Sequence, residues 1–209
     1  PLLLRAAPAI ALRLHRKPNQ QVQLEAITAL NAELRGHVVI CGYGRVGQSI
    51  GRFLRREQQA FIALDDNPER VQEAATEDSS VHYGDCRRGA LLSAVGLERA
   101  RLVVIAVDNS DVALTVLKEA RRINHKVPIL VRTRDDSQLT ELKAAGASEV
   151  VPELLESSLM LASHAMIMLG LPDQQVRDRV DEVRRNRYRL LHGFYQHTDD
   201  NREAPINPD

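Results

Sequence analysis

Three glycines with a fixed spacing are the residues of this chain whose chemistry is easiest to interpret. Gly42, Gly44 and Gly47 form GxGxxG within VVICGYGRVGQSIGRFL, residues 38–54. An apolar run precedes them and a helical pattern follows, which is the context of a phosphate-binding turn. The first glycine would permit the tight turn, the second would let phosphate oxygens approach, and the third would let the helix pack closely. The amides of residues 44–47 and the helix dipole would then hold phosphates.

A carboxylate follows the glycine turn at the distance that a nucleotide requires. Asp65 ends the next apolar run, and its carboxylate can accept hydrogen bonds from both ribose hydroxyls. Asp66 adds a second negative charge, which would repel a 2′-phosphate. The sequence therefore favours NAD, AMP or ATP over NADP. The alternative is that the glycines form a plain packed turn.

Polar residues also follow the later apolar runs, and a parallel sheet would bring them to the same edge. We expect Asp85 near the adenine, Asp108 and Asn109 near a second nucleotide half or a terminal phosphate, and Arg132 near a phosphate. Their alternatives are structural. The three acidic or amide side chains could cap helices, and Arg132 could form a surface ion pair.

No arrangement of residues suggests catalysis. A dehydrogenase needs a second domain with a proton donor, and only residues 152–209 follow the predicted sheet. His164 lies in an apolar helical pattern, so we expect it to be packed or capped. His192 and His197 lie near the chain end. We therefore predict a nucleotide site without enzymatic activity, with a soluble NAD-dependent oxidoreductase as the alternative.

Composition excludes several classes of protein. Basic and acidic residues number 28 each, and this balance argues against nucleic acid as a partner. The cysteines Cys41 and Cys86 lie far apart, so neither a disulfide framework nor a metal site is predicted. Cys41 ends an apolar run and should be a small buried residue.

Alternating strand and helix patterns predict an α/β fold over residues 37–152. The apolar runs are continuous, as in strands that are covered on both faces. Helices between them imply parallel pairing with right-handed crossovers. We predict a doubly wound, six-stranded parallel Rossmann sheet, with strands at 37–41, 60–64, 81–83, 102–106, 128–132 and 148–151 and helices between them.

The flanking segments have different patterns. Residues 1–36 are apolar, then basic, then polar, which is typical of the end of a membrane helix and a linker; an amphipathic packing helix is the alternative. Residues 153–169 form a helix that is apolar on most sides and needs more cover than one sheet provides. Residues 173–195 are predicted to form a charged helix. The two helices together make residues 153–196 a helical region. Residues 197–209 are predicted to be disordered.

The motifs together resemble the nucleotide-binding regulatory domains known as RCK or TrkA-N domains, over roughly residues 37–170. The stretches ALDDNPERV, VHYGDCRRGALLSAVGLERARLVVIAVDN and VRTRDDSQLTELKAAGASEVVPE carry this resemblance with the glycine turn. The form is similar to the cytoplasmic domain of Kef-type monovalent cation–proton antiporters. The resemblance implies a non-enzymatic domain that gates potassium or sodium transport, on the cytoplasmic side of the bacterial inner membrane.

The resemblance also implies ligands and partners. Its ligands are AMP or NAD(H), with ATP possible, and its partners are a second copy, through residues 153–195, and the membrane antiporter domain of the same chain. The residues implied to bind the nucleotide are Gly42, Tyr43, Gly44, Arg45, Val46, Gly47, Asp65, Asp66, Asp85, Cys86, Asp108, Asn109 and Arg132. A free-standing regulatory subunit of a potassium channel or transporter is a further alternative.

Glutathione-gated members of this family have a second pocket, rich in arginine. Arg52 matches one of its residues, but Pro152 stands where an arginine is expected, and the expected asparagine falls near Asn186 or Arg187, with Arg187 the better match. We therefore do not expect glutathione gating. A related anion could use Arg52, Arg184, Arg185 and Arg187, unless the late arginines form a solvated helix face.

Overall fold

The computed structural model describes residues 20–75 and 80–186. Its centre is a six-stranded sheet in the order β3-β2-β1-β4-β5-β6. The strands are β1 (Val38–Cys41), β2 (Phe61–Asp65), β3 (Val81–Tyr83), β4 (Leu102–Ile105), β5 (Ile129–Thr133) and β6 (Glu149–Pro152). The predicted parallel, doubly wound sheet is confirmed, with β1 pairing in parallel with β2 and β4.

The sequence of the central strands explains their place in the sheet. Val38 lies opposite Phe61 on one side and Leu102 on the other. Every residue of β1 and β2 is buried, because helices cover both faces of a doubly wound sheet and only apolar side chains are suited to both. The order reverses between β1 and β4, and such a switch point leaves a crevice at the carboxyl ends of the strands.

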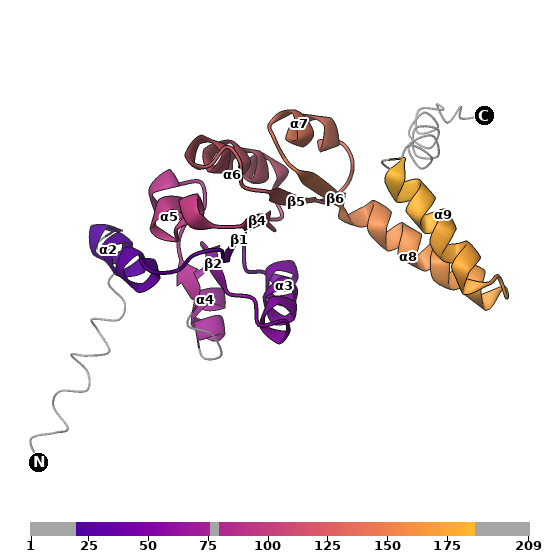
Figure 1. Ribbon diagram of the computed structural model, residues 1–209, viewed down its shortest axis with the longest axis horizontal. Coiled ribbons are helices and arrows are strands. Elements are labelled where there is room, and N and C mark those ends of the chain that lie inside the picture. The colour runs from indigo at the N-terminus through magenta and orange to yellow at the C-terminus, as the bar shows by residue number, and fades with distance from the viewer. Residues whose placement is uncertain (1–19, 76–79, 187–209) are drawn as a thin grey trace, which may run out of the picture. The chain divides into compact units, whose positions relative to one another are not determined.

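Helices α3 and α4 lie on one face of the sheet, and α5 and α6 on the other (Figure 1). The helices are α2 (Gln20–Asn31), α3 (Arg45–Arg56), α4 (Pro68–Ala75), α5 (Gly89–Ala94), the 3-10 turn η1 (Leu97–Arg99), α6 (Ser110–Ile123), α7 (Leu139–Ala144), α8 (Glu153–Met168) and α9 (Asp173–Arg185). Helix α7 begins only at Leu139, because Asp135 accepts hydrogen bonds from the amide and hydroxyl of Ser137 and forms a turn before it.

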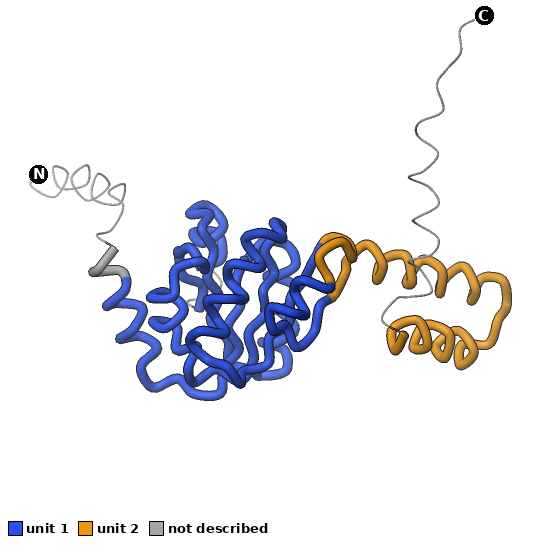
Figure 2. The backbone as a smooth tube through the Cα atoms, turned by 90° about the horizontal axis from the view of Figure 1, so that it is seen from above, with its two compact units in different colours: residues 1–133, 140–150 blue, residues 134–139, 151–209 orange. Residues whose placement is uncertain are grey.

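The chain divides into two compact units (Figure 2). The first holds the sheet as far as Val150, and the second holds residues 134–139 and the chain from Val151. Within the second unit, α8 and α9 lie side by side in an antiparallel hairpin (Figures 1 and 2). Leu155 and Leu159 pack there against Val183.

Parts of the predictions for the chain ends fall outside the described residues. The start of the predicted membrane-helix end and linker (residues 1–36), the tail at 197–209 and the charged helix beyond Asn186 lie outside the described residues. Among the described helices, none is both long enough and apolar enough to cross a bilayer.

The linker helix α2 is held by hydrogen bonds from Arg99 of the turn η1. The guanidinium of Arg99 donates to the carbonyl oxygens of Asn31, the last residue of α2, and of Leu34 in the following loop. The next residues lead to His37, which is fully buried. Its Nε2 lies 2.8 Å from the carbonyl oxygen of Val95, and its Nδ1 is a buried nitrogen without a hydrogen-bond partner.

Candidate functional site

The glycine turn has a conformation that side chains at two of its positions would prevent. Gly42 has φ of +92°, and a Cβ there would lie 2.9 Å from a methyl carbon of Val107. A Cβ on Gly47 would lie 2.2 Å from the carbonyl oxygen of Gly42. The turn therefore brings α3 against β1 at a distance that only glycine permits, as predicted from the spacing.

The middle glycine has a different environment. Gly44 is the N-cap of α3 and supplies no side chain to cap it, so the amides of the first turn have no partner within the helix. A Cβ on Gly44 would have one neighbour within 4 Å, a guanidinium nitrogen of Arg70 at 3.8 Å. Arg45, the first residue of α3, is exposed. This helix end can accept an anion.

Asp65 joins the glycine turn to the loop after β2. Its Oδ2 accepts from the backbone N–H of Tyr43 at 2.6 Å, and its Oδ1 accepts from the N–H of Asn67 at 2.8 Å. Its side chain is only 3% exposed. Each carboxylate oxygen can accept more than one hydrogen bond, so binding of ribose remains a prediction. Asp66, which we predicted beside it, is exposed.

Three of the predicted binding residues direct their side chains into the protein. The Tyr43 ring is buried and stacks on Phe61 with ring centroids 6.2 Å apart, and Val46 packs against the same apolar cluster. Cys86 is buried, with its sulfur 3.6 Å from the carbonyl oxygen of Leu64. A hydrogen bond with Cys41 and burial raise the pKa of the Cys86 thiol. These residues can offer a ligand their backbone, but Tyr43 and Cys86 do not present an exposed side chain. The prediction that Cys41 is buried is confirmed.

The polar residues after β3 and β4 form local contacts. Asp85 accepts from both the backbone and the guanidinium of Arg87, and these hydrogen bonds lower the pKa of its carboxyl. Asn109 is the N-cap of α6, where its side chain accepts from the amides of Asp111 and Val112. The alternative role of Asn109 as a cap is therefore realised, and contact with a ligand remains a prediction for it.

Arg132 and Asp108 form an ion pair that joins the ends of β5 and β4. The hydrogen bond from Arg132 holds the pKa of the Asp108 carboxyl below its usual value, and the positive charges of Arg70 and Arg45 act in the same direction. Three arginines from α3, α4 and β5 thus lie near one carboxylate at this edge of the sheet. Arg132 is paired with Asp108 in the structure. To contact a phosphate, Arg132 would have to bind both anions at once or give up its ion pair with Asp108.

Arg70 is a candidate site residue that the sequence reasoning missed. Its Nη1 lies 3.6 Å from Oδ1 of Asp65. It is the third residue of α4, whose start is capped by the side chain of Asn67. The sequence did carry a signal for Arg70, because only a short segment separates Asp65, at the end of β2, from the first turn of α4. Such a short connection brings this turn back to the glycine loop.

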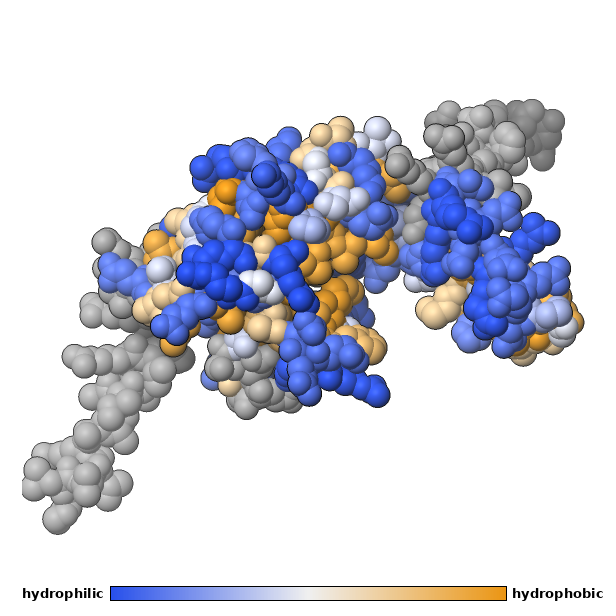
Figure 3. Space-filling model, viewed as in Figure 1, coloured by the Kyte–Doolittle hydropathy of each residue, from blue (hydrophilic) through white to orange (hydrophobic). Residues whose placement is uncertain are grey.

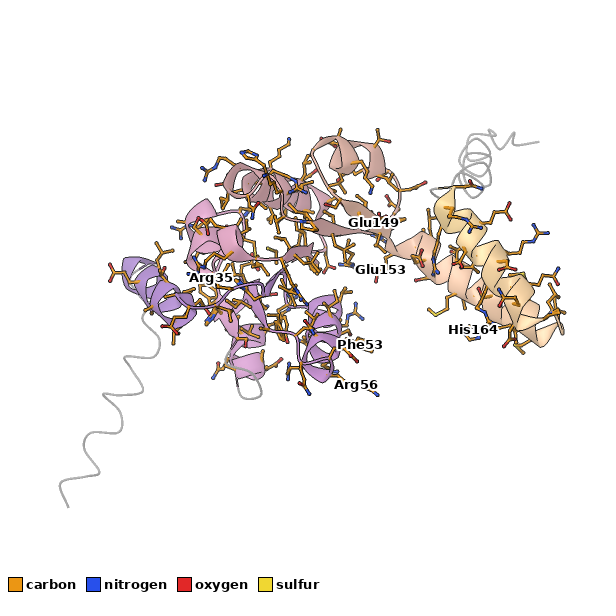
Figure 4. All side chains as sticks on the ribbon, viewed as in Figure 1. Arg35, Phe53, Arg56, Glu149, Glu153 and His164 are labelled. Atoms are coloured by element: carbon orange, nitrogen blue, oxygen red, sulfur yellow. The ribbon has the colours of Figure 1, made fainter. Side chains whose placement is uncertain are left out.

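The late arginines of the helical hairpin fit one of our two predictions, since Arg184 and Arg185 are exposed on α9 as in a solvated helix face. His164, which we expected to be packed or capped, is exposed on α8 in the single chain (Figure 4), and packing against a second copy stays a prediction. Arg184 forms an ion pair with Glu156 at 2.7 Å. An anion that binds Arg184 would therefore compete with the carboxylate of Glu156. Arg187 lies outside the described residues.

A separate cavity of about 550 Å³ lies at the opposite edge of the sheet. Its walls come from the end of α2 and the loop after it, from Arg55 of α3, and from the segments at β2 and β3 that include Phe61 and Ser80. The glycine turn, at the carboxyl end of β1, contributes nothing to it. Within residues 20–75 and 80–186, no group of histidine, cysteine and acidic side chains could hold a metal ion.

Comparison with known proteins identifies related chains. The sequence model of the TrkA-N domain matches residues 38–153. A putative K(+) efflux antiporter KefB of Alkalimonas amylolytica is 46% identical over 158 residues, which are 76% of this chain and 24% of that protein. A glutathione-regulated potassium-efflux system protein KefC of Klebsiella pneumoniae is 31% identical over 73% of this chain and 25% of its own length. The chain thus spans about a quarter of these relatives.

Solved structures share the fold. A structure described as the Shewanella denitrificans Kef CTD in AMP-bound form has a TM-score of 0.64 and 30% identity, covering 75% of this chain and 96% of that one. The GsuK channel bound to NAD has a TM-score of 0.57 at 22% identity, covering 76% of this chain and 26% of that one. The second likeness concerns the fold alone.

Proposed function

Because the chain belongs to the TrkA-N domain family, we propose that it is the nucleotide-sensing regulatory domain of a potassium–proton antiporter. The ligand is an adenine nucleotide, AMP or NAD(H), and the domain gates ion transport without catalysing a reaction. The names of its relatives support potassium as the transported ion. The AMP-bound relative, at 30% identity, supports AMP as the first ligand to test.

The observation that carries this proposal is the pairing of the glycine turn with Asp65. Gly42 and Gly47 admit no side chain, and the uncapped start of α3 offers amides to phosphate oxygens. Asp65 is bonded to the same turn through Tyr43. Phosphate and ribose would therefore bind to a connected unit, with the phosphate at the start of α3 and the ribose hydroxyls at Asp65.

Gating requires that the nucleotide bind two arrangements of the protein with different affinity. We propose that these are two arrangements of a homodimer joined through the α8–α9 hairpin. A heptad stripe of exposed apolar side chains supports this, with Leu154 at 52%, Leu161 at 72% and Met168 at 87% exposure. Hydrophobic residues are visible at the surface of this hairpin among hydrophilic ones (Figure 3). In this proposal the domain lies on the cytoplasmic side of the inner membrane and continues from a membrane domain through residues 1–36.

Calorimetric titration of the 209-residue chain with AMP and NADH tests the ligand. We expect binding of at least one of them, and the absence of heat with both would contradict the proposal. The oxidoreductase alternative is tested by incubating the same protein with NADH and small carbonyl compounds. We expect no consumption of NADH; steady consumption that a substitution at Gly44 abolishes would favour the enzyme.

A further inference from the structure

Arg70 occupies a position that neither the glycine motif nor the acidic strand end predicts. Its guanidinium is 3.8 Å from the point where a Cβ of Gly44 would lie. In a glycine turn of this kind, the middle glycine is where the backbone and the phosphates approach each other. Arg70 therefore holds a positive charge next to the expected position of the phosphate.

The present partner of Arg70 leaves it able to bind an anion. Its Nη1 is 3.6 Å from Asp65, whereas a charge-assisted hydrogen bond is about 2.7–2.9 Å long. Its side chain is 46% exposed, while that of Arg132 is 19% exposed and is paired with Asp108. Of these two arginines, Arg70 requires less rearrangement to reach a ligand.

The backbone of Arg70 is held by hydrogen bonds at the start of α4, so the fold fixes the point from which its side chain extends. Asn67 Oδ1 accepts from the amides of Glu69 and Arg70 at 2.9 and 3.1 Å. The amide of Asn67 in turn donates to Asp65 at 2.8 Å. The carboxylate, the helix cap and the arginine are thus linked through one short segment.

We infer that Arg70 contacts the ligand: its guanidinium moves away from Asp65 and binds the phosphate of the nucleotide. Arg70 thereby selects phosphorylated adenosines over adenosine. This inference rests on the proposed nucleotide site. In the structure the guanidinium lies beside the buried carboxylate of Asp65. In the bound protein the phosphate replaces Asp65 as the partner of Arg70, and the ribose hydroxyls donate hydrogen bonds to the carboxylate of Asp65. A nucleoside without a phosphate would gain only the second of these contacts.

The test compares AMP with adenosine in the unmodified chain, in Arg70→Gln and in a control. Arg122→Gln is the control, because Arg122 forms an exposed ion pair with Glu119 on α6. Dissociation constants come from calorimetry for AMP and from NMR titration for the weaker adenosine. Arg70→Gln should weaken AMP by about 10- to 100-fold, the range for loss of a charge-assisted hydrogen bond. It should change adenosine affinity by less than about threefold, and the control should change neither.

The outcomes separate this inference from the proposed function. If the unmodified chain binds AMP and the preference for AMP over adenosine is the same in Arg70→Gln, then Arg70 does not contact the phosphate and the inference is wrong. If Arg70→Gln weakens both ligands equally, the residue acts only through Asp65, which also contradicts the inference. If the unmodified chain binds neither AMP nor NADH, the proposed function fails first. Arg70→Lys adds a check, since it keeps the charge and should retain part of the preference.

Discussion

The backbone N–H of Tyr43 donates to the carboxylate of Asp65 across 2.6 Å, inside a region where both residues are buried. One residue belongs to the glycine turn and the other ends the neighbouring strand, so this hydrogen bond joins the two halves of the proposed site. Asp65 thereby has a structural role in addition to the predicted contact with ribose. A substitution at Asp65 must affect the turn as well as the ligand.

We predict that Asp65→Ala lowers both the free energy of unfolding and nucleotide affinity. The substitution leaves the amides of Tyr43 and Asn67 without their acceptor, and a buried unsatisfied donor costs about 1–3 kcal/mol. Asp65→Asn keeps one acceptor oxygen and should be intermediate in stability. Urea denaturation and calorimetry with AMP measure the two quantities.

Glu141→Ala is the matched control for this prediction, because it removes an exposed carboxylate from α7. It should change neither quantity. Unchanged AMP affinity in a folded Asp65→Ala variant would show that the carboxylate does not contact the ligand and that the turn does not depend on it.

Alanine at two glycines should separate folding from binding. A Cβ at Gly47 would lie 2.2 Å from the carbonyl oxygen of Gly42, so Gly47→Ala should destabilise the fold by about 1–3 kcal/mol or more through overpacking. Gly44→Ala meets only a guanidinium nitrogen at 3.8 Å. It should fold normally and lose AMP affinity. Thermal unfolding and calorimetry check both variants, and equal stability of the two would contradict this account of the turn.

The pattern of the sequence was sufficient for the sheet and for the glycine turn. Buried parallel strands require continuous apolar runs, and glycine is required wherever a Cβ would collide, so both features are visible in the residue types. Gly47 is an example, since a Cβ there would collide with the carbonyl oxygen of Gly42 in the same turn. Such local constraints can be read without knowledge of distant contacts.

The partners of charged side chains could not be predicted in the same way. Asp108 and Arg132 pair because β4 and β5 are neighbours, and either residue could have faced a ligand instead. Arg70 was missed because its importance depends on its distance to Gly44, which the sequence does not state. His164 was expected to be packed because its helix is apolar, but the single chain leaves it exposed.

The buried imidazole of His37 predicts that stability depends on pH. Burial lowers the pKa of His37 in the folded protein, and the charge of Arg99 acts in the same direction. Nε2 is occupied by Val95, and Nδ1 is buried without a partner. The unfolded state therefore binds the proton more readily. Stability should be highest above the unfolded pKa of 6.5 and should fall as the pH drops below it, towards the lower folded pKa.

Urea denaturation between about pH 5 and pH 7.5 measures this slope, because carboxyl groups with lowered pKa titrate below about pH 4. His37→Gln should flatten the dependence, whatever its effect on absolute stability. His125→Gln removes an exposed imidazole and should keep the slope of the unmodified protein. An identical slope in the His37 and His125 variants would rule out His37 as its source.

The two sides of α8 have different roles within the hairpin. Leu155 and Leu159 are buried against Val183 of α9. Leu154, Leu161 and Met168 lie seven residues apart, which places them on one stripe of the helix, and they are exposed in the single chain. A charge at Leu159 would therefore disrupt the hairpin itself, whereas a charge at Leu161 tests the outer stripe.

We predict that the chain is a dimer and that Leu161→Glu converts it to a folded monomer. Burial of each large apolar side chain stabilises an interface by about 1.5–3 kcal/mol, so loss of one at the centre of the stripe, with a charge in its place, should shift the dissociation constant by at least about a hundredfold. Ala144→Glu places the same charge on an exposed position of α7 and should leave the dimer intact. Sedimentation velocity at micromolar concentration gives the mass of each variant, and circular dichroism confirms that the helices remain. A monomeric unmodified chain would contradict both the dimer and the gating proposal that depends on it.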